Sequence, residues 1–497
     1  MVNIKEIITM CKNGQLDAAL DAAKAELEKS PQDVWAQRAM GWALYYAVRE
    51  EIAQQRKDDA LSYAELLLKL NMLDGEQDSM IFDSLLWKLC ELLKQAQKDD
   101  FAFADRVFGL LSVRQLNASQ AYSVLLKNFL AFKGWPKMMQ CLEWWNLDKL
   151  QPEDYKPFKL ENGRSVMALA EQAYIAYAKG LLQSGDKERI RAFVPKMEKL
   201  MDGCPEMTYP GYFCGKLLMA TGAGRDEALK AVMPFVHKKQ TEFWVWQLLS
   251  EIYKEDITLQ LACLLRAVHC KTQETFLGKV RMKLANLYCM QGDYNRARYQ
   301  TDAVGVCCQR QGWHVPYDVQ DLMRRPEMQQ AVADGTPSVD YKGITNRILM
   351  SDAERHIAAV TYVDAEAKRA HLIYGYHKHL AVPIRKLGMP VQTGMLIWLY
   401  LLPERDGNPK VAGTDKGVTE RDLDGVGYIK TFSGAVTRKE GADFGFLNEG
   451  KTSCYIGKQL VRQYNLSNGS VAGVVAALVY NKQKDLWNWA AIRVTNQ

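Results

Sequence analysis

The stretch GAVTRKEGADFGFLNEGKTSCYIGKQL, residues 434–460, decides the architecture of the last third of the chain. It holds three short runs of β-branched, aromatic and polar residues, at 430–439, 444–449 and 453–460 once its N-terminal neighbours are included. Such short, turn-separated runs are typical of strands with one buried face. Two further runs follow, SVAGVVAALVYN at 470–481 and LWNWAAIRV at 486–494. The sequence therefore predicts a five-stranded β-barrel over residues 428–497.

A second series of strands precedes this barrel. Five short runs, at 356–364, 369–377, 379–384, 394–404 and 409–413, are rich in β-branched and aromatic residues. Their spacing predicts another small barrel over residues 341–425. The sequence DGTPS at 334–338 reads as a linker and places the boundary near residues 325–345. We therefore expect two tandem barrels of the oligonucleotide- and oligosaccharide-binding (OB) type.

The first two thirds of the chain, residues 1–330, are predicted to be a helical repeat array. In KNGQLDAALDAAKAELEKSP, residues 12–31, Gly14 ends one helix, two alanines share a face of the next, and Pro31 closes it. The stretch LANLYCMQGDYNRARYQTDA, from residue 284, repeats this design. Looser copies lie around Gly185, at 245–268, and near Gly41, where VREEIAQQRKDD (48–59) is predicted to be an insertion between two helices.

This pattern resembles the tetratricopeptide repeat, in which small residues allow paired helices to pack closely. The resemblance implies a solenoid whose groove binds a peptide or partner protein, and the alternative is a simple spacer. Trp135, Trp144 and Trp145 interrupt the array. They form either an exposed interaction patch or the filling of a corner between helices, and the second reading is favoured.

The second barrel resembles a cold-shock domain. Its Gly434-x-Val436 strand, its Phe444-Gly445-Phe446 strand and the outward aromatic Tyr455 match that family's pattern. The resemblance covers roughly residues 430–495 and implies binding of single-stranded nucleic acid, RNA more than DNA. The chain departs from the pattern where Arg438 and Lys439 replace first-strand aromatics, and where Asp443 precedes the first phenylalanine.

The residue types suit that chemistry. Aromatic side chains on adjacent strands offer flat faces on which unpaired bases stack, and nearby cations contact phosphates. In the second barrel, Phe444, Phe446 and Tyr455 are the predicted stacking residues. Trp487 and Trp489, two apart on the last strand, either extend this platform or cap the barrel core. The predicted phosphate-binding residues are Arg438, Lys439, Lys451, Lys458 and Arg462.

The first barrel carries a weaker version of the same pattern. Tyr374 and Tyr376 are its predicted stacking residues, with Tyr362 and His371 as possible neighbours. Four histidines, His356, His371, His377 and His379, fall close together. A metal site is one interpretation, because alternate residues of a strand share a face. Since acidic residues and cysteines at matching spacing are missing from the sequence there, we predict no metal and expect surface or base-stacking histidines.

The charge distribution and the absence of catalytic motifs limit the classes of function that the sequence supports. Residues 341–497 contain 21 Lys and Arg against 14 Asp and Glu, a net charge of +7, whereas residues 1–340 carry 43 against 44. The basic surplus indicates an anionic partner for the last third. The sequence has no Walker loop, GxSxG, HExxH or GxGxxG motif, so we expect neither an enzyme nor a cofactor. The absence of CxxC pairs, of a signal-peptide core and of a long apolar run favours a reduced, cytoplasmic protein without membrane contact.

Together these features predict a non-enzymatic scaffold that joins a protein-binding solenoid to a tandem OB module for single-stranded nucleic acid. The architecture also resembles accessory components of bacterial conflict and defence gene clusters. The alternative is a pure protein–protein adaptor whose barrels do not bind nucleic acid.

Overall fold

The computed structural model describes residues 3–74, 76–163, 165–403, 409–481 and 485–496. It divides into two compact units, residues 1–238 and 239–497. Helices form the first two thirds, and a five-stranded sheet and a closed five-stranded barrel form the last third. The predicted fold class, helical first and then all-β, is confirmed. The predicted helical array at 1–330 extends over both units.

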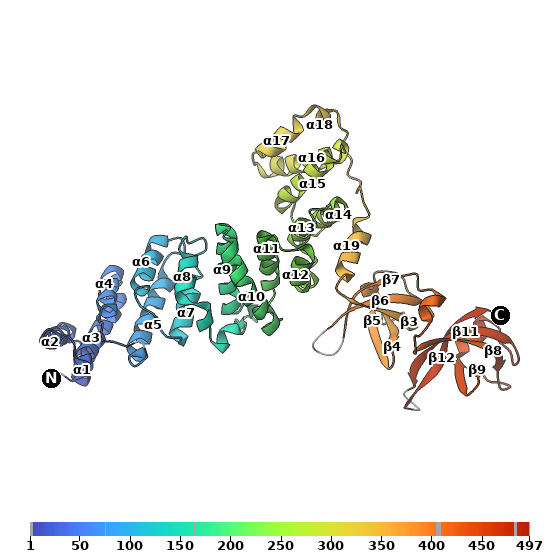
Figure 1. Ribbon diagram of the computed structural model, residues 1–497, viewed down its shortest axis with the longest axis horizontal. Helices are drawn as coiled ribbons and strands as arrows, with labels where there is room; N and C mark the ends of the chain where they lie inside the picture. Colours follow the sequence, from blue (N-terminus) through green and yellow to red (C-terminus); the bar gives the residue numbers. More distant parts are fainter. Residues whose placement is uncertain (1–2, 75, 164, 404–408, 482–484, 497) are drawn as a thin grey trace. The chain divides into compact units, whose positions relative to one another are not determined.

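The first unit consists of helices that follow one another side by side (Figure 1). Three short elements, η1 (Leu147–Lys149), η2 (Pro152–Tyr155) and the hairpin β1 (Phe158–Lys159) with β2 (Ser165–Val166), separate the eighth helix from the ninth. The helices are α1 (Ile4–Lys12), α2 (Leu16–Lys29), α3 (Val34–Ala53), α4 (Lys57–Leu68), α5 (Ser79–Gln95), α6 (Phe101–Leu111), α7 (Gln120–Phe129), α8 (Met138–Trp145), α9 (Leu169–Ser184), α10 (Lys187–Gly203), α11 (Pro210–Thr221) and α12 (Arg225–Lys239).

Small residues set the close approach of these helices. Ala19 and Ala23 on α2 are fully buried, as the predicted helix face requires. On α11, a Cβ added to Gly215 would lie 2.1 Å from Cγ1 of Val232 on α12, so a side chain there has no room. The predicted insertion at 48–59 is wrong. Its first half continues α3 to Ala53, and Gln55, with φ of 60°, makes the turn into α4.

Of the three tryptophans of the predicted corner, two are buried in it and Trp144 is half-buried. Trp135 and Trp145 are 2% and 0% exposed, and the Trp145 ring stacks on Tyr122 with centroids 4.7 Å apart. The Trp144 indole donates to the Arg114 carbonyl at 2.9 Å. The corner interpretation is therefore confirmed, and the exposed patch is excluded for Trp135 and Trp145.

The helical part of the second unit leads into the β structure. Its helices are α13 (Phe243–Ile252), α14 (Ile257–Val268), η3 (Glu274–Phe276), α15 (Gly278–Met290), α16 (Tyr294–Gln311), α17 (Tyr317–Met323), α18 (Pro326–Gln330) and α19 (Tyr341–Met350). The predicted linker is fastened to α15 and α16, because Ser338 bonds the Tyr288 hydroxyl at 3.1 Å and Asp334 pairs with Arg296 at 3.3 Å. Helix α19 then packs on α14, where Tyr341 stacks on His269.

The strands lie close to their predicted positions. The first sheet contains β3 (Glu354–Asp364), β4 (Arg369–Gly375), β5 (Lys378–Pro383), β6 (Leu396–Leu402) and β7 (Lys410–Asp415), with η4 (Ile384–Leu387) after β5. After η5 (Glu420–Leu423), the second barrel contains β8 (Ile429–Thr437), β9 (Gly445–Glu449), β10 (Thr452–Ile456), α20 (Lys458–Gln463), β11 (Val471–Asn481) and β12 (Leu486–Asn496).

Both β domains share one strand order. The first runs β5-β4-β3-β6-β7 and the second β10-β9-β8-β11-β12, so each has the order 3-2-1-4-5. The second closes into a barrel through the parallel pair β10–β12. Among the described residues, the first is a five-stranded sheet with β5 and β7 at its ends, without a strand pair between them like the one that closes the second. Helix η4 packs against both end strands, and Thr414 donates to the Leu387 carbonyl there.

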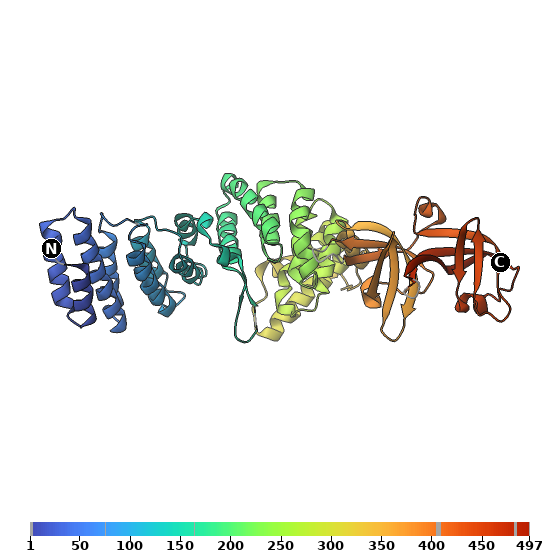
Figure 2. The same cartoon turned by 90° about the horizontal axis from the view of Figure 1, so that it is seen from below.

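The two β domains bury a common apolar cluster, and both views show them side by side (Figures 1 and 2). The cluster joins the outer faces of both domains: Ile357, Ala359, Ile373, Ile429, Val475, Ala477 and Ile492. The Tyr428 hydroxyl donates across the junction to the Ile357 carbonyl at 2.7 Å. Gly394, with φ of +87°, approaches β12 so closely that a Cβ there would lie 2.4 Å from the Ile492 carbonyl oxygen. This junction fixes the two domains against each other.

Candidate nucleic-acid interface

Three aromatic rings gather on the outer face of β9 and β10. Phe446 and Tyr455 are directly opposite each other in the antiparallel pair, and Phe444 immediately precedes β9. The three ring centroids are 5.7–5.8 Å apart in each pairing. Their exposed fractions are 41% for Phe444, 37% for Phe446 and 40% for Tyr455. We call this set the β9–β10 platform, and it brings together the three predicted stacking residues of the cold-shock-like stretch.

The strand period explains why these rings point outward. The residues next to them along the strands, Leu447, Cys454 and Ile456, belong to the buried core of the barrel. Gly445 is buried between the two phenylalanines, and a Cβ there would lie 3.0 Å from Cγ1 of Val436. Burial raises the pKa of Cys454 to about 12, so its thiol stays neutral in the core. The inner face is therefore tightly packed, and the rings occupy the outer one.

Two of the predicted phosphate-binding cations share one carboxylate. Lys458 and Arg462 lie four residues apart on α20, on the same side of the helix. Asp443 accepts from Nη2 of Arg462 at 3.2 Å and is 3.6 Å from Nζ of Lys458. The Arg462 guanidinium, and next the Lys458 charge, hold the pKa of Asp443 below its ordinary value. All three side chains are exposed, so water screens this contact and it is weak.

The remaining predicted cations differ in their surroundings. Lys439 and Lys451 are exposed, in the loop before β9 and the turn before β10. Arg438 instead donates to the carbonyls of Ala442, at 2.7 Å, and Leu466, at 3.0 Å. Its guanidinium thus braces the loop that leads to Phe444. The sequence did not predict this structural role of Arg438, because it shows that the side chain is charged but not which carbonyls lie close to it.

The two tryptophans of β12 have different neighbours. Trp489 packs against the barrel core and meets the Phe432 ring edge-on, with centroids 5.6 Å apart. For Trp489 the core-capping alternative is therefore correct. Trp487 packs on the cluster between the two domains, and its ring stacks on His377 at 4.7 Å. Neither tryptophan is in ring contact with the β9–β10 platform in the described structure.

The first sheet separates its predicted stacking residues. Tyr374 is 9% exposed and belongs to the sheet's core, so its ring has no open face for a base; this corrects the prediction for Tyr374. Tyr376 is 63% exposed in the β4–β5 turn. His356 contacts Tyr374, and His371 contacts Tyr362, on separate parts of the sheet. Among the described residues, no group of three or more His, Cys, Asp or Glu side chains could hold a metal ion.

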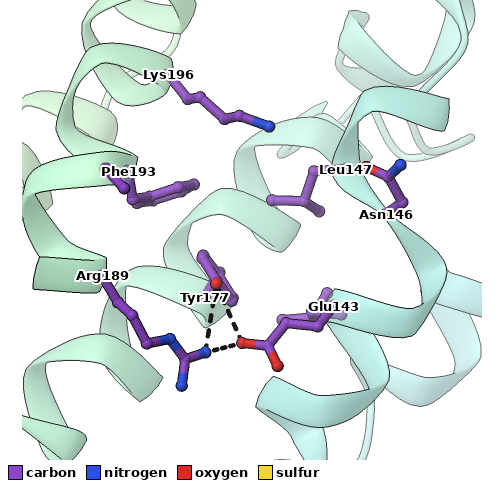
Figure 3. Close-up of a pocket in the computed structure, with 9 residues that line it drawn as sticks. Glu143, Asn146, Leu147, Tyr177, Arg189, Phe193 and Lys196 are labelled. Atoms are coloured by element: carbon purple, nitrogen blue, oxygen red, sulfur yellow. Dashed lines mark hydrogen bonds and ion pairs between the residues drawn. The ribbon is translucent and has the colours of Figure 1, made fainter. Parts of the chain in front are cut away.

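The first unit contains a pocket of about 290 Å³ between α8, α9 and α10 (Figure 3). Phe193 and Leu147 supply apolar walls. At one end, Tyr177 donates to Glu143 at 3.1 Å, and Arg189 forms an ion pair with the same carboxylate. At the other end, Lys196 pairs with Asp148 at 2.8 Å. Sequence reasoning missed this pocket, because its residues come from α8, α9, α10 and the start of η1 and follow no motif.

Comparisons with known proteins match two segments. Residues 430–494 match the family model described as S1/CSD-like domain 2 of the TOTE conflict systems, where CSD denotes the cold-shock domain. Residues 208–346 match a domain of unknown function, DUF7017. The first match contains the β9–β10 platform, and it agrees with the cold-shock-like segment expected from the sequence. No curated protein matches the chain. Among the described residues, no helix is both long and apolar enough to cross a membrane.

Proposed function

We propose that the chain is a non-enzymatic scaffold that binds single-stranded nucleic acid, preferably RNA, at the β9–β10 platform. The observation that carries the proposal is the triangle of exposed rings of Phe444, Phe446 and Tyr455 on strands 2 and 3 of a closed OB-type barrel. In that fold, the face of strands 2 and 3 is the usual surface for oligonucleotides. The similarity of residues 430–494 to a conflict-system S1/CSD-like domain supports the same role and a place in such a system.

The charge distribution also supports an anionic ligand. The net charge of +7 in residues 341–497 includes exposed Lys439 and Lys451 near the platform. Phosphates would displace Asp443 from Lys458 and Arg462, since an exposed ion pair is easily exchanged. Stacking contributes about 1–3 kcal/mol per base and reads every base, so we expect little sequence specificity.

The helical part would then recruit a protein partner. The pocket between α8, α9 and α10 supports this half of the proposal, because it offers apolar walls with a charged pair at each end. Such a site suits an apolar side chain of a peptide whose flanking residues are charged. The tetratricopeptide-like character of the array remains a prediction.

A pure protein–protein adaptor is the second candidate, and one observation favours it. Asp443 is already paired with two of the five predicted phosphate-binding side chains, and Arg438 is engaged with carbonyls. In this case, the exposed rings would contact a protein.

Fluorescence anisotropy of the full chain with labelled single-stranded RNA, single-stranded DNA and duplex separates the candidates. The scaffold should bind single strands. About four phosphate contacts predict a slope near −3 in the plot of log affinity against log salt. An adaptor would bind none of the three probes even at low salt, and that result would overturn the proposal.

A further inference from the structure

A second group of rings lies where hairpins from the two β domains meet. His377, in the turn between β4 and β5, stacks on Trp487 of β12 with centroids 4.7 Å apart and planes 9° apart. Its ring also stacks on Tyr376 at 4.4 Å. Tyr480 of β11 and His379 of β5 contact the same indole at 5.4 and 6.1 Å. We call these five residues the junction stack.

His377 has a left-handed backbone conformation in the turn between β4 and β5. Its φ is 59°, in the left-handed region that non-glycine residues seldom occupy. The register pairs Gly375 with Lys378, so Tyr376 and His377 form a two-residue turn. Such strain persists where surrounding contacts over-determine it, and it often marks functional surfaces. Here the strained turn holds two adjacent rings against a tryptophan from another domain.

The junction stack ends in open rings. Tyr376 is 63% exposed and Tyr480 39%. Tyr480 contacts Trp487, which packs on the buried cluster between the two domains. Lys378, next to His377, is exposed and supplies a cation at the edge. The carboxylate nearby, Asp485, already accepts the Tyr480 hydroxyl. The arrangement therefore repeats the two components of the β9–β10 platform, exposed aromatic faces and an adjacent cation.

The two ring sets lie on neighbouring strands. Tyr455 is paired with Ala490 of β12, and Trp487 precedes Ala490 by three residues on that strand. Three residues of a strand span about 10 Å. The paired ends of β11 and β12, at Tyr480 and Trp487, belong to strands 4 and 5 of the barrel, whose connection borders the ligand face in OB folds. This separation is short enough for a few nucleotides to span, and because it is an odd number of residues, the strand would turn around this edge of the barrel between the two sets.

We infer that the junction stack is a second base-stacking platform for the same single-stranded nucleic acid, built jointly by the two β domains. The inference rests on the proposed function of the β9–β10 platform and extends its ligand. The occupied length becomes longer than one barrel alone would hold, and Tyr376 presents the terminal ring. The first β domain then takes part in binding although its own strand face is covered.

The test is a length series of labelled single-stranded RNA against the full chain, with probes of about five and about 15 nucleotides, within the range of OB site sizes. The variant is Tyr376→Ala, which removes an exposed ring without opening the core. The matched control is Tyr362→Ala, because Tyr362 is also an exposed tyrosine of the first sheet, at 56%, but lies outside the stack. Thermal unfolding of each variant reports whether the junction remains intact.

We expect Tyr376→Ala to weaken binding of the long probe at least about fivefold and to leave the short probe unchanged, the effect of losing one stacked base. Tyr362→Ala should change neither. If wild type and Tyr376→Ala bound the long probe with equal affinity, the inference would be overturned. Binding of the short probe would in that case still support the β9–β10 platform. If the wild-type chain bound neither probe, the proposed function and this extension would both fall. The variant Tyr376→Phe should retain long-probe affinity, since it keeps the ring.

Discussion

The two β domains share a strand order, yet they expose different surfaces. In the second barrel, the outer faces of β8, β11 and β12 meet the neighbouring domain through Ile429, Val475 and Ile492, and β9 and β10 keep their outer faces open. In the first sheet, β3 and β4 contribute Ile357 and Ile373 to that same cluster. The junction thus covers the strand face of one domain and leaves that of β9 and β10 exposed in the other. Equal topology does not give equal exposed surfaces, because the packing between the domains decides which strand faces remain accessible.

We expect the strongest change in single-strand affinity when the rings of the β9–β10 platform are removed. The triple change Phe444→Ala, Phe446→Ala, Tyr455→Ala should lower single-strand affinity at least about 100-fold, because three stacking rings are lost. Anisotropy titration measures it. The rings are on the outer face, so the circular dichroism spectrum and the melting of the chain should change little. The contrary outcome is a folded triple variant that binds as well as the wild type.

The next prediction concerns stability and tests the close contact between the two β domains. Gly394→Ala should reduce the free energy of unfolding of the second unit by about 3 kcal/mol, from left-handed strain and overlap with the Ile492 carbonyl. Denaturant unfolding measures this change.

The matched control for the junction is Gly388→Ala. Gly388 has φ of +68° but open space around its Cβ position, so only strain applies and we expect a loss of about 1 kcal/mol. Equal losses for the two variants would contradict the tight approach of the domains at Gly394.

A smaller effect tests the cations beside the open face. Lys451→Gln should make the salt slope of single-strand binding shallower by about 0.7, the value of one phosphate contact. Lys416→Gln is the control, an exposed lysine of the loop after β7. A slope that Lys451→Gln left unaltered would remove Lys451 from the phosphate path.

The smallest effect concerns Asp443. Asp443→Asn should raise single-strand affinity about threefold at low salt, because Lys458 and Arg462 would then face phosphates without a competing charge. The pKa of Asp443 is lowered, so the carboxylate stays charged at neutral pH and loses its charge only as the pH falls below the ordinary range of an aspartate. Wild-type affinity should therefore show no Asp443-dependent change between pH 6 and 8, and a decrease in affinity for the Asn variant would contradict this role.

Local sequence patterns predicted most strands of both β domains and the direction of the platform side chains. The runs at 356–364 and 470–481 become β3 and β11 almost residue for residue, because alternation and turn residues are local signals. The outward direction of Phe446 and Tyr455 follows from the same period.

Contacts between distant residues were beyond those patterns. Tyr374 has an aromatic strand signature, but core packing buries it. His377 and Trp487 are 110 positions apart, and nothing local to either predicts their stacking. The open first sheet and the bracing role of Arg438 likewise depend on which carbonyls and strands converge in space.

The most direct test of the β9–β10 platform as the nucleic-acid site is ultraviolet crosslinking of single-stranded RNA to the full chain, followed by identification of the crosslinked peptides. The proposed β9–β10 platform predicts crosslinks to Phe444, Phe446 and Tyr455 with a short probe. The junction stack predicts additional crosslinks to Tyr376 or Trp487 with a long probe. Crosslinks confined to the helical part of the chain, or to the first sheet without the β9–β10 platform, would contradict this placement of the site.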